Sequence, residues 1–103
     1  MDVALPIVFN QAQIVSFCQR HSICKLSLFG SVLRADFADT SDVDCLVEFE
    51  PGKTPGLAIV RMENELSTLL QGRKVDLRTP HELSRYFRDR VLSEAVTLYD
   101  AVG

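Results

Sequence analysis

Two short hydrophobic segments, joined through a Gly-Ser turn and a loop, constrain the fold of this chain more than any other feature. The first segment runs from Leu26 to Phe29 and ends at Gly30-Ser31. The second runs from Val43 to Phe49 and alternates hydrophobic with polar residues, which is typical of a strand with one buried face. We therefore expect two short strands of a sheet, with a Gly-Ser turn directly after the first.

A pair of carboxylates, Asp42 and Asp44, opens the second strand. Side chains two residues apart on a strand point to the same face, so these carboxylates repel each other unless a cation lies between them. Their oxygens suit Mg²⁺, which usually binds one or two carboxylates together with substrate phosphates. Gly30-Ser31 can bring backbone N–H groups and a hydroxyl close to a phosphate. The arrangement predicts a site for a metal-bound nucleoside triphosphate.

A third acid, Asp76, lies in the short segment Lys74-Val75-Asp76-Leu77, which we predict to be another strand. If that strand lies beside the Asp42/Asp44 strand, the three carboxylates form one cluster of the kind that two-metal phosphoryl transfer uses. Asp76 would then act as a metal ligand, as a general base for an acceptor hydroxyl, or as both. An Asp-x-Asp pair alone more often marks a solvated strand face, so the prediction depends on the joint arrangement.

With these motifs in place, the sequence closely resembles the DNA polymerase β-like nucleotidyltransferase superfamily. Within it, the chain is similar to the minimal nucleotidyltransferases that act as antitoxins beside HEPN-type toxins. The motif of that group is G-S-x-x-R-x-D, four residues, then S-D-x-D, followed later by V-D-L. The positions that match it are Gly30, Ser31, Arg34, Asp36, Ser41, Asp42, Asp44, Val75, Asp76 and Leu77. Ala35 departs from the pattern, because many relatives carry Gly there.

The resemblance implies an activity and a set of residue roles. The implied enzyme is an Mg²⁺-dependent protein adenylyltransferase that moves AMP from ATP to a tyrosine hydroxyl of a cognate HEPN ribonuclease toxin and silences it. Asp42, Asp44 and Asp76 would be catalytic and hold two Mg²⁺ ions. Gly30 and Ser31 would contact the nucleotide. Arg34 would either contact the triphosphate or pair with Asp36.

Two other functions remain open. The chain could be an antitoxin that only binds and blocks the toxin, or a nucleotidyltransferase acting on a small molecule. The intact acids favour chemistry over pure blocking. The small size of the chain disfavours a built-in pocket for a small acceptor.

Length and charge agree with one small domain over residues 1–103. The chain has 103 residues, of which 47% are hydrophobic, and this suffices for one core. A net charge of −3 argues against direct binding of nucleic acid. No apolar stretch is long enough to span a membrane. Three cysteines without a CxxC pair fit reduced thiols and therefore a cytoplasmic protein.

The periodicity and the turn residues predict an α+β fold, a small mixed sheet backed by helices in the order α-β-β-α-β-α. Asn10 is expected to cap the first helix, and the Thr79-to-Glu82 segment has the form of a capping box that opens the last helix. Arg85, Arg88 and Arg90 in that helix could meet nucleotide or a partner, although a solvated basic face is the commoner meaning of such a run. The expected elements are helices over 11–20, 57–70 and 80–99, strands over 26–29, 42–50 and 75–77, and one helical turn over 31–36.

Overall fold

A computed structural model describes residues 7–33, 42–53 and 56–101 of the chain. Within these ranges the α+β class is confirmed, as one four-stranded sheet with three α-helices. The elements are α1 (Gln11–Arg20), β1 (Ile23–Phe29), β2 (Val43–Phe49), α2 (Ile59–Leu69), β3 (Val75–Arg78), α3 (Arg85–Glu94) and β4 (Val96–Asp100), with single 3₁₀ turns η1 (Gly30–Leu33), η2 (Gly56–Ala58) and η3 (Pro80–Glu82).

The sheet is mixed, with the strands in the order β3-β2-β1-β4. β1 pairs antiparallel with both β2 and β4, whereas β2 and β3 are parallel. Parallel neighbours need a crossover, and α2 supplies it by carrying the chain from the end of β2 back to the start of β3. This β2-α2-β3 unit places the beginnings of β2 and β3 side by side.

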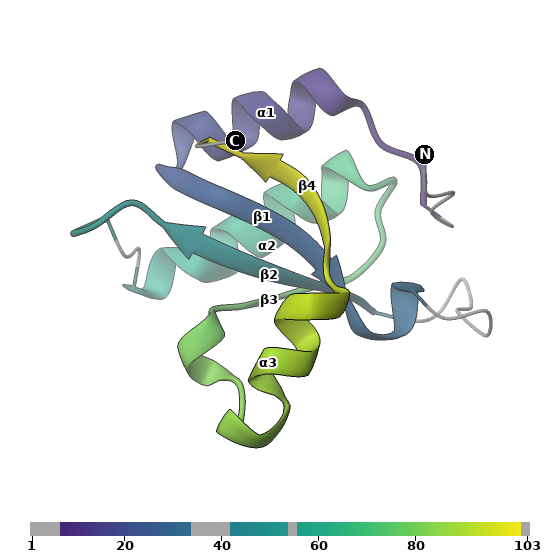
Figure 1. Ribbon diagram of the computed structural model, residues 1–103. Coiled ribbons are helices and arrows are strands. Elements are labelled where there is room, and N and C mark those ends of the chain that lie inside the picture. The colour runs from purple at the N-terminus through teal and green to yellow at the C-terminus, as the bar shows by residue number, and fades with distance from the viewer. Residues whose placement is uncertain (1–6, 34–41, 54–55, 102–103) are drawn as a thin grey trace.

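One face of the sheet is covered by α1 and α2, which lie together in Figure 1. The side chain of Asn10 caps α1 by accepting a hydrogen bond from the Gln13 N–H at 3.2 Å, as predicted. Ile14, Phe17 and Cys18 of α1 point into the core, three and four residues apart as an amphipathic helix requires. The main core joins these helices to the sheet through Met62, Leu66, Leu26, Leu28, Val43, Cys45, Val47, Val75 and Leu77.

The buried thiols of this core are unreactive. Burial raises the pKa of Cys18 to about 12. Burial also raises the pKa of Cys45, and the neighbouring Asp44 and Asp76 carboxylates raise it further. A thiol that stays protonated is a poor nucleophile and a poor metal ligand, so Cys45 serves as a small residue of the core.

The opposite face of the sheet carries the acids, and we call it the acid-bearing face, defined by Asp44 and Asp76. Strand alternation puts Leu46 and Glu48 of β2 on this face as well. Leu46 is buried, as is Leu83, which follows η3, but neither belongs to the main core. The chain therefore buries a little hydrophobic surface on this side, and most of it on the other.

The exposed edge of the sheet at β3 is protected by a side chain from α2. The carboxylate of Glu63 accepts a hydrogen bond from the Leu77 N–H at 2.8 Å. An unpaired strand edge is a template for aggregation, and a carboxylate placed on its N–H groups blunts that risk. This contact also fixes β3, and with it Asp76, against α2.

The predicted last helix is wrong over residues 95–99, because α3 ends at Glu94 and a fourth strand follows. Ala95 is already extended, with φ −61° and ψ 141°. The residues that follow pair with β1, Thr97 with Ser27 and Val96 with Leu28. Branched and aromatic residues favour strands where a partner edge is available, and β1 offers one.

The predicted capping box does form, but it opens a single turn rather than a long helix. The Glu82 carboxylate accepts from the Thr79 N–H at 3.2 Å. Leu83 then turns extended, and Ser84 caps a separate helix by accepting from the Tyr86 N–H at 3.3 Å. Because η3 and α3 are separated in this way, α3 stands apart from α1 and α2 in Figure 1.

Candidate active site

Asp44 and Asp76 occupy facing positions on the neighbouring strands β2 and β3. Their backbones are register partners, and a hydrogen bond of 2.8 Å from the Val43 N–H to the Lys74 carbonyl holds this register. Partners across a parallel ladder project to the same face, so both carboxylates lie on the acid-bearing face. Both side chains are half-buried, whereas Asp42, just before β2, is exposed. The strand adjacency that the sequence could only suppose is therefore real.

Cations lie beside two of the three acids, Asp76 and Asp42. Arg78 donates to the Asp76 carboxylate at 3.0 Å, and this hydrogen bond raises the pKa of Arg78. The Lys74 ammonium lies 3.9 Å from the Asp42 carboxylate. The sequence did not assign Arg78 to Asp76, although a signal existed, because residues two apart on a strand share a face.

Gly30 packs its backbone directly against Asp44. Its φ of +75° is a left-handed conformation, which only glycine adopts without strain. A Cβ atom placed on it would lie 2.6 Å from Asp44 Oδ2, closer than real contacts allow. Phe29 is also the register partner of Asp44 on β1. The end of β1 therefore meets Asp44 of β2, which places the Gly-Ser turn beside one of the predicted metal ligands.

Other predicted site residues fall outside what the structure describes. Arg34, Asp36 and Ser41 lie in the undescribed stretch 34–41. The backbone of Ser31 belongs to η1, and its side chain is not described. The described part of the predicted helical turn is confirmed as η1.

The carboxylates of Asp44 and Asp76 could supply part of the coordination shell of Mg²⁺. Within residues 7–33, 42–53 and 56–101, no three His, Cys, Asp or Glu side chains form a ready-made metal site. Mg²⁺ does not need one, since it usually takes one or two carboxylates and completes its shell with water and substrate phosphates. Asp44 and Asp76 are the pair that could hold it, and the hard oxygen donors exclude a preference for softer metals.

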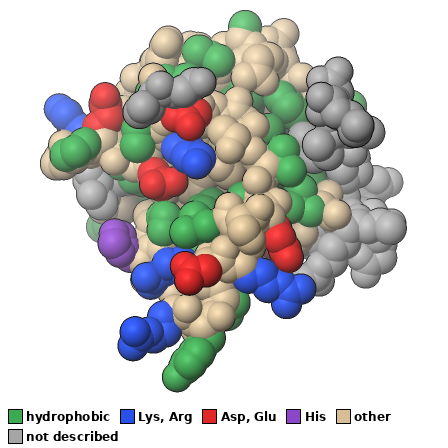
Figure 2. Space-filling view, viewed as in Figure 1, with side chains coloured by type: hydrophobic (Ala, Val, Ile, Leu, Met, Phe, Trp, Pro, Cys, Tyr) green, Lys and Arg blue, Asp and Glu red, His purple; other side chains and the backbone are tan. Residues whose placement is uncertain are grey.

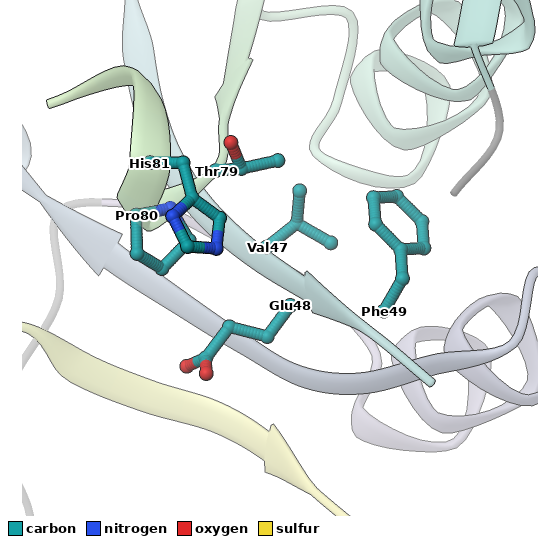
Figure 3. Close-up of a pocket in the computed structure, with 6 residues that line it drawn as sticks. All are labelled: Val47, Glu48, Phe49, Thr79, Pro80 and His81. Atoms are coloured by element: carbon teal, nitrogen blue, oxygen red, sulfur yellow. The ribbon is translucent and has the colours of Figure 1, made fainter. Parts of the chain in front are cut away.

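Among the cavities lined by described residues, one lies beside β2 and another beside the end of β1, and the second includes a residue of the predicted site. A cavity of about 430 Å³ lies at the far end of β2 from Asp44, between that strand and η3 (Figure 3). It is lined by Val47, Glu48, Phe49, Thr79, Pro80 and His81. A smaller cavity, of about 290 Å³, lies between the end of β1 and α3. Gly30, which packs against Asp44, lines this smaller cavity.

Among the described residues, no helix is long and apolar enough to cross a membrane.

The chain is similar in sequence to several known proteins. Residues 12–101 match the family model described as polymerase beta, nucleotidyltransferase. A Methanocaldococcus jannaschii protein named as a candidate protein adenylyltransferase is 39% identical over 82% of this chain and 88% of its own length. The protein adenylyltransferase MntA of Thermococcus cleftensis is 35% identical over 76% of this chain and 77% of its own length.

Solved structures with the same fold include one described as a candidate minimal nucleotidyltransferase. It is 37% identical to this chain, with a TM-score of 0.69, and the match covers 84% of this chain and 86% of that one. A toxin–antitoxin structure with AMP-PNP also has a TM-score of 0.69, at 20% identity, covering 89% of this chain and 74% of that one. At that identity the second likeness shows the fold alone.

Proposed function

Because the chain belongs to the polymerase β nucleotidyltransferase family, we propose that residues 1–103 act as one minimal domain that transfers AMP from ATP to a tyrosine hydroxyl of a HEPN-type ribonuclease toxin. The modification neutralises the toxin, which makes this chain its antitoxin. The observation that carries the proposal is the facing pair Asp44 and Asp76, with the backbone of Gly30 packed against Asp44.

Each residue of the motif has a role in the proposed reaction. Gly30 and Ser31 bind the phosphates of ATP, and Arg34 contacts the triphosphate. Asp42, Asp44 and Asp76 would hold two Mg²⁺ ions, which would supply positive charge where the transferred phosphate becomes more negative. Arg78 pairs with Asp76 at 3.0 Å and orients that carboxylate.

The proposed reaction is an in-line displacement at the α-phosphorus. The tyrosine oxygen forms a bond to that phosphorus, and the bond from it to the bridging oxygen of the β-phosphate breaks. Pyrophosphate leaves, and the phenolic proton passes to Asp76 or to water. Asp76 suits this role because it lies on a separate strand from Asp42 and Asp44 and can approach the acceptor from its own side.

The relatives support a protein as acceptor. Curated relatives in two archaea are named as protein adenylyltransferases. Structures of the same fold include complexes named MntA-HepT toxin-antitoxin and one with AMP-PNP. The proposed reaction takes place in the cytoplasm, where ATP is abundant and the free thiols of Cys18, Cys24 and Cys45 stay reduced.

The experiment that tests the proposal uses Asp76→Asn. The chain is incubated with ATP, Mg²⁺ and the helical protein encoded beside it, and the intact mass of that protein is measured. The parent should add AMP to that protein, whereas Asp76→Asn should add none. The affinity of Asp76→Asn for Mg-ATP should nevertheless stay within about tenfold of the parent's, ~1.4 kcal/mol. The matched control is Glu48→Gln, on the same face of β2 but away from the facing acids, which should label normally.

The same variant separates the alternatives. Asp76→Asn that labels its partner at the parental rate would remove the third acid from the mechanism. Full protection of cells by Asp76→Asn would mean that binding alone neutralises the toxin. Transfer to a small hydroxyl compound but not to any protein partner would assign the chain to small-molecule modification instead.

A further inference from the structure

α3 exposes hydrophobic side chains that the core does not use. None of its ten described residues is buried. Tyr86 is 93% exposed and Phe87 is 47% exposed. Single exposed hydrophobic residues need no special explanation. Phe87 differs from its neighbour Tyr86 because it lines a cavity, and Tyr86 does not.

That cavity, of about 290 Å³, has the composition of a small-molecule pocket. Phe29, Phe87 and Val91 give it apolar walls. Arg90 and Glu94 form its polar rim and are joined by an ion pair of 3.1 Å. Ligand pockets are mostly hydrophobic and aromatic, with a few polar groups that fix orientation. An aromatic wall facing an open pocket suits a flat ring, because nucleic-acid bases stack on phenylalanine.

Two residues of this cavity, Gly30 and Phe29, also neighbour Asp44 of the proposed phosphate site. Gly30 lines the cavity and also packs against Asp44 Oδ2. Phe29 lines it too and is the register partner of Asp44. A molecule with its phosphates at Asp44 and Asp76 therefore has one adjoining described hollow into which its remaining part can extend.

We propose that this cavity between α3 and the end of β1 holds the nucleobase of the substrate nucleotide, with Phe87 as the residue on which the base stacks. Arg90 and Glu94 face the polar edge of the base and offer it a donor and an acceptor. The inference rests on the proposed function for the presence of a nucleotide. It goes beyond that function in giving α3 the binding of the base.

The test compares two ligands that differ only in the base and sugar. The affinities of Mg-ATP and of Mg-tripolyphosphate are measured by calorimetry for the parent, Phe87→Ala, Phe87→Trp and the matched control Tyr86→Ala. Phe87→Ala should weaken ATP about tenfold, ~1.4 kcal/mol, and leave tripolyphosphate unchanged. Phe87→Trp should keep the affinity for ATP, because its larger ring still stacks. Tyr86→Ala should change neither.

Different failures have different meanings. Parental ATP affinity in Phe87→Ala would overturn the base pocket and leave the proposed function intact. Equal losses for ATP and tripolyphosphate would overturn it as well, because Phe87 would then be supporting the phosphate site. A parent protein that binds neither ligand would overturn the nucleotide assignment itself. Circular dichroism confirms the fold of each variant, and the exposure of Phe87 makes unfolding unexpected.

Discussion

Two helices of ten residues, α1 and α3, each carry a phenylalanine and use it in opposite ways. Phe17 of α1 is fully buried against the sheet, whereas Phe87 of α3 is 47% exposed. α1 buries three of its side chains and α3 buries none of those described. The difference separates a region that holds the fold together from one that is available to bind a ligand.

The cause lies in how hydrophobic and charged residues are spaced along each helix. In α1 the hydrophobic residues recur at three and four residues and leave a polar opposite side. In α3 basic and acidic residues surround Phe87, and Figure 2 shows basic and acidic side chains intermixed in the lower part of the molecule, where α3 lies. Within this region, Arg88 of α3 donates to the carbonyl of Leu83, just before the helix, at 3.0 Å. Substitutions on the acid-bearing face should change AMP transfer, and substitutions on the face covered by α1 and α2 should change stability.

The largest expected effect is on the acid-bearing face and concerns activity alone. Asp42→Ala and Asp44→Ala should each lower AMP transfer by about a thousandfold, ~4 kcal/mol, because the charge at the reacting phosphate is no longer offset. The melting temperature should stay equal or rise, because two repelling carboxylates are relieved. Mass spectrometry of the partner and thermal unfolding measure the two. A double variant that labels at the parental rate would remove the metal site from these residues.

The next largest effect is on stability alone and concerns the face of the sheet that α1 and α2 cover. Phe17→Ala should lower the free energy of unfolding by about 3–5 kcal/mol, because a fully buried ring leaves a cavity. Phe87→Ala is the matched change in α3 and should cost under about 1 kcal/mol. Urea unfolding of both variants measures the contrast. Equal losses would mean that α3 supports the fold as much as α1 does.

Gly30 contributes to both stability and the acid site. Its substitution should have an intermediate effect on the free energy of unfolding. Gly30→Ala should destabilise the chain by about 2 kcal/mol, since its φ of +75° strains any other residue and the new Cβ meets Asp44 Oδ2. Adding Asp44→Ala should recover the steric part, with a coupling of about 1 kcal/mol. Strictly additive losses in this double-mutant cycle would show that the backbone strain alone carries the cost.

The smallest effect depends on pH and concerns the polar contact between α1 and α2. Burial raises the pKa of Glu65, but its hydrogen bonds with Arg20 and His21 outweigh this and leave the pKa below its ordinary value of 4.5. A lowered pKa adds stability that is complete above the ordinary value and is lost as the pH falls through the lowered one.

Glu65→Gln should therefore cost about 0.5–1 kcal/mol at pH 7 and nothing once the parent carboxyl is protonated. Thermal unfolding of the parent and of the variant, from pH 7 down to a pH at which the parent carboxyl is protonated, measures this loss of stability. Glu94→Gln is the control, because it breaks only the exposed pair with Arg90 inside α3 and should change stability less. A loss that persists unchanged in acid would assign the role of Glu65 to packing.

Much of the fold was predictable because its signals are local. The start of α1 at Asn10 and the capping box at Thr79 follow from side chains that reach backbone groups three residues away. The α+β class followed from the periodicity, and the expected strand over 75–77 lies within β3. The end of α3 was not predictable in this way, because residues 95–99 suit either a helix or a strand and the choice was made by the free edge of β1.

By itself, the sequence determined the motif: a Gly-Ser turn, two acids two residues apart at the start of a strand, a third acid on a later strand, and with them the family. Only the tertiary structure decided that Asp76 stands opposite Asp44, that Gly30 packs against the same carboxylate, and that Phe87 borders the adjoining cavity. The physical reason is distance along the chain. Spacing of a few residues fixes which side chains share a face, whereas contacts between residues 30, 44, 76 and 87 depend on strand pairing and on where α3 comes to lie, which are properties of the whole packed chain.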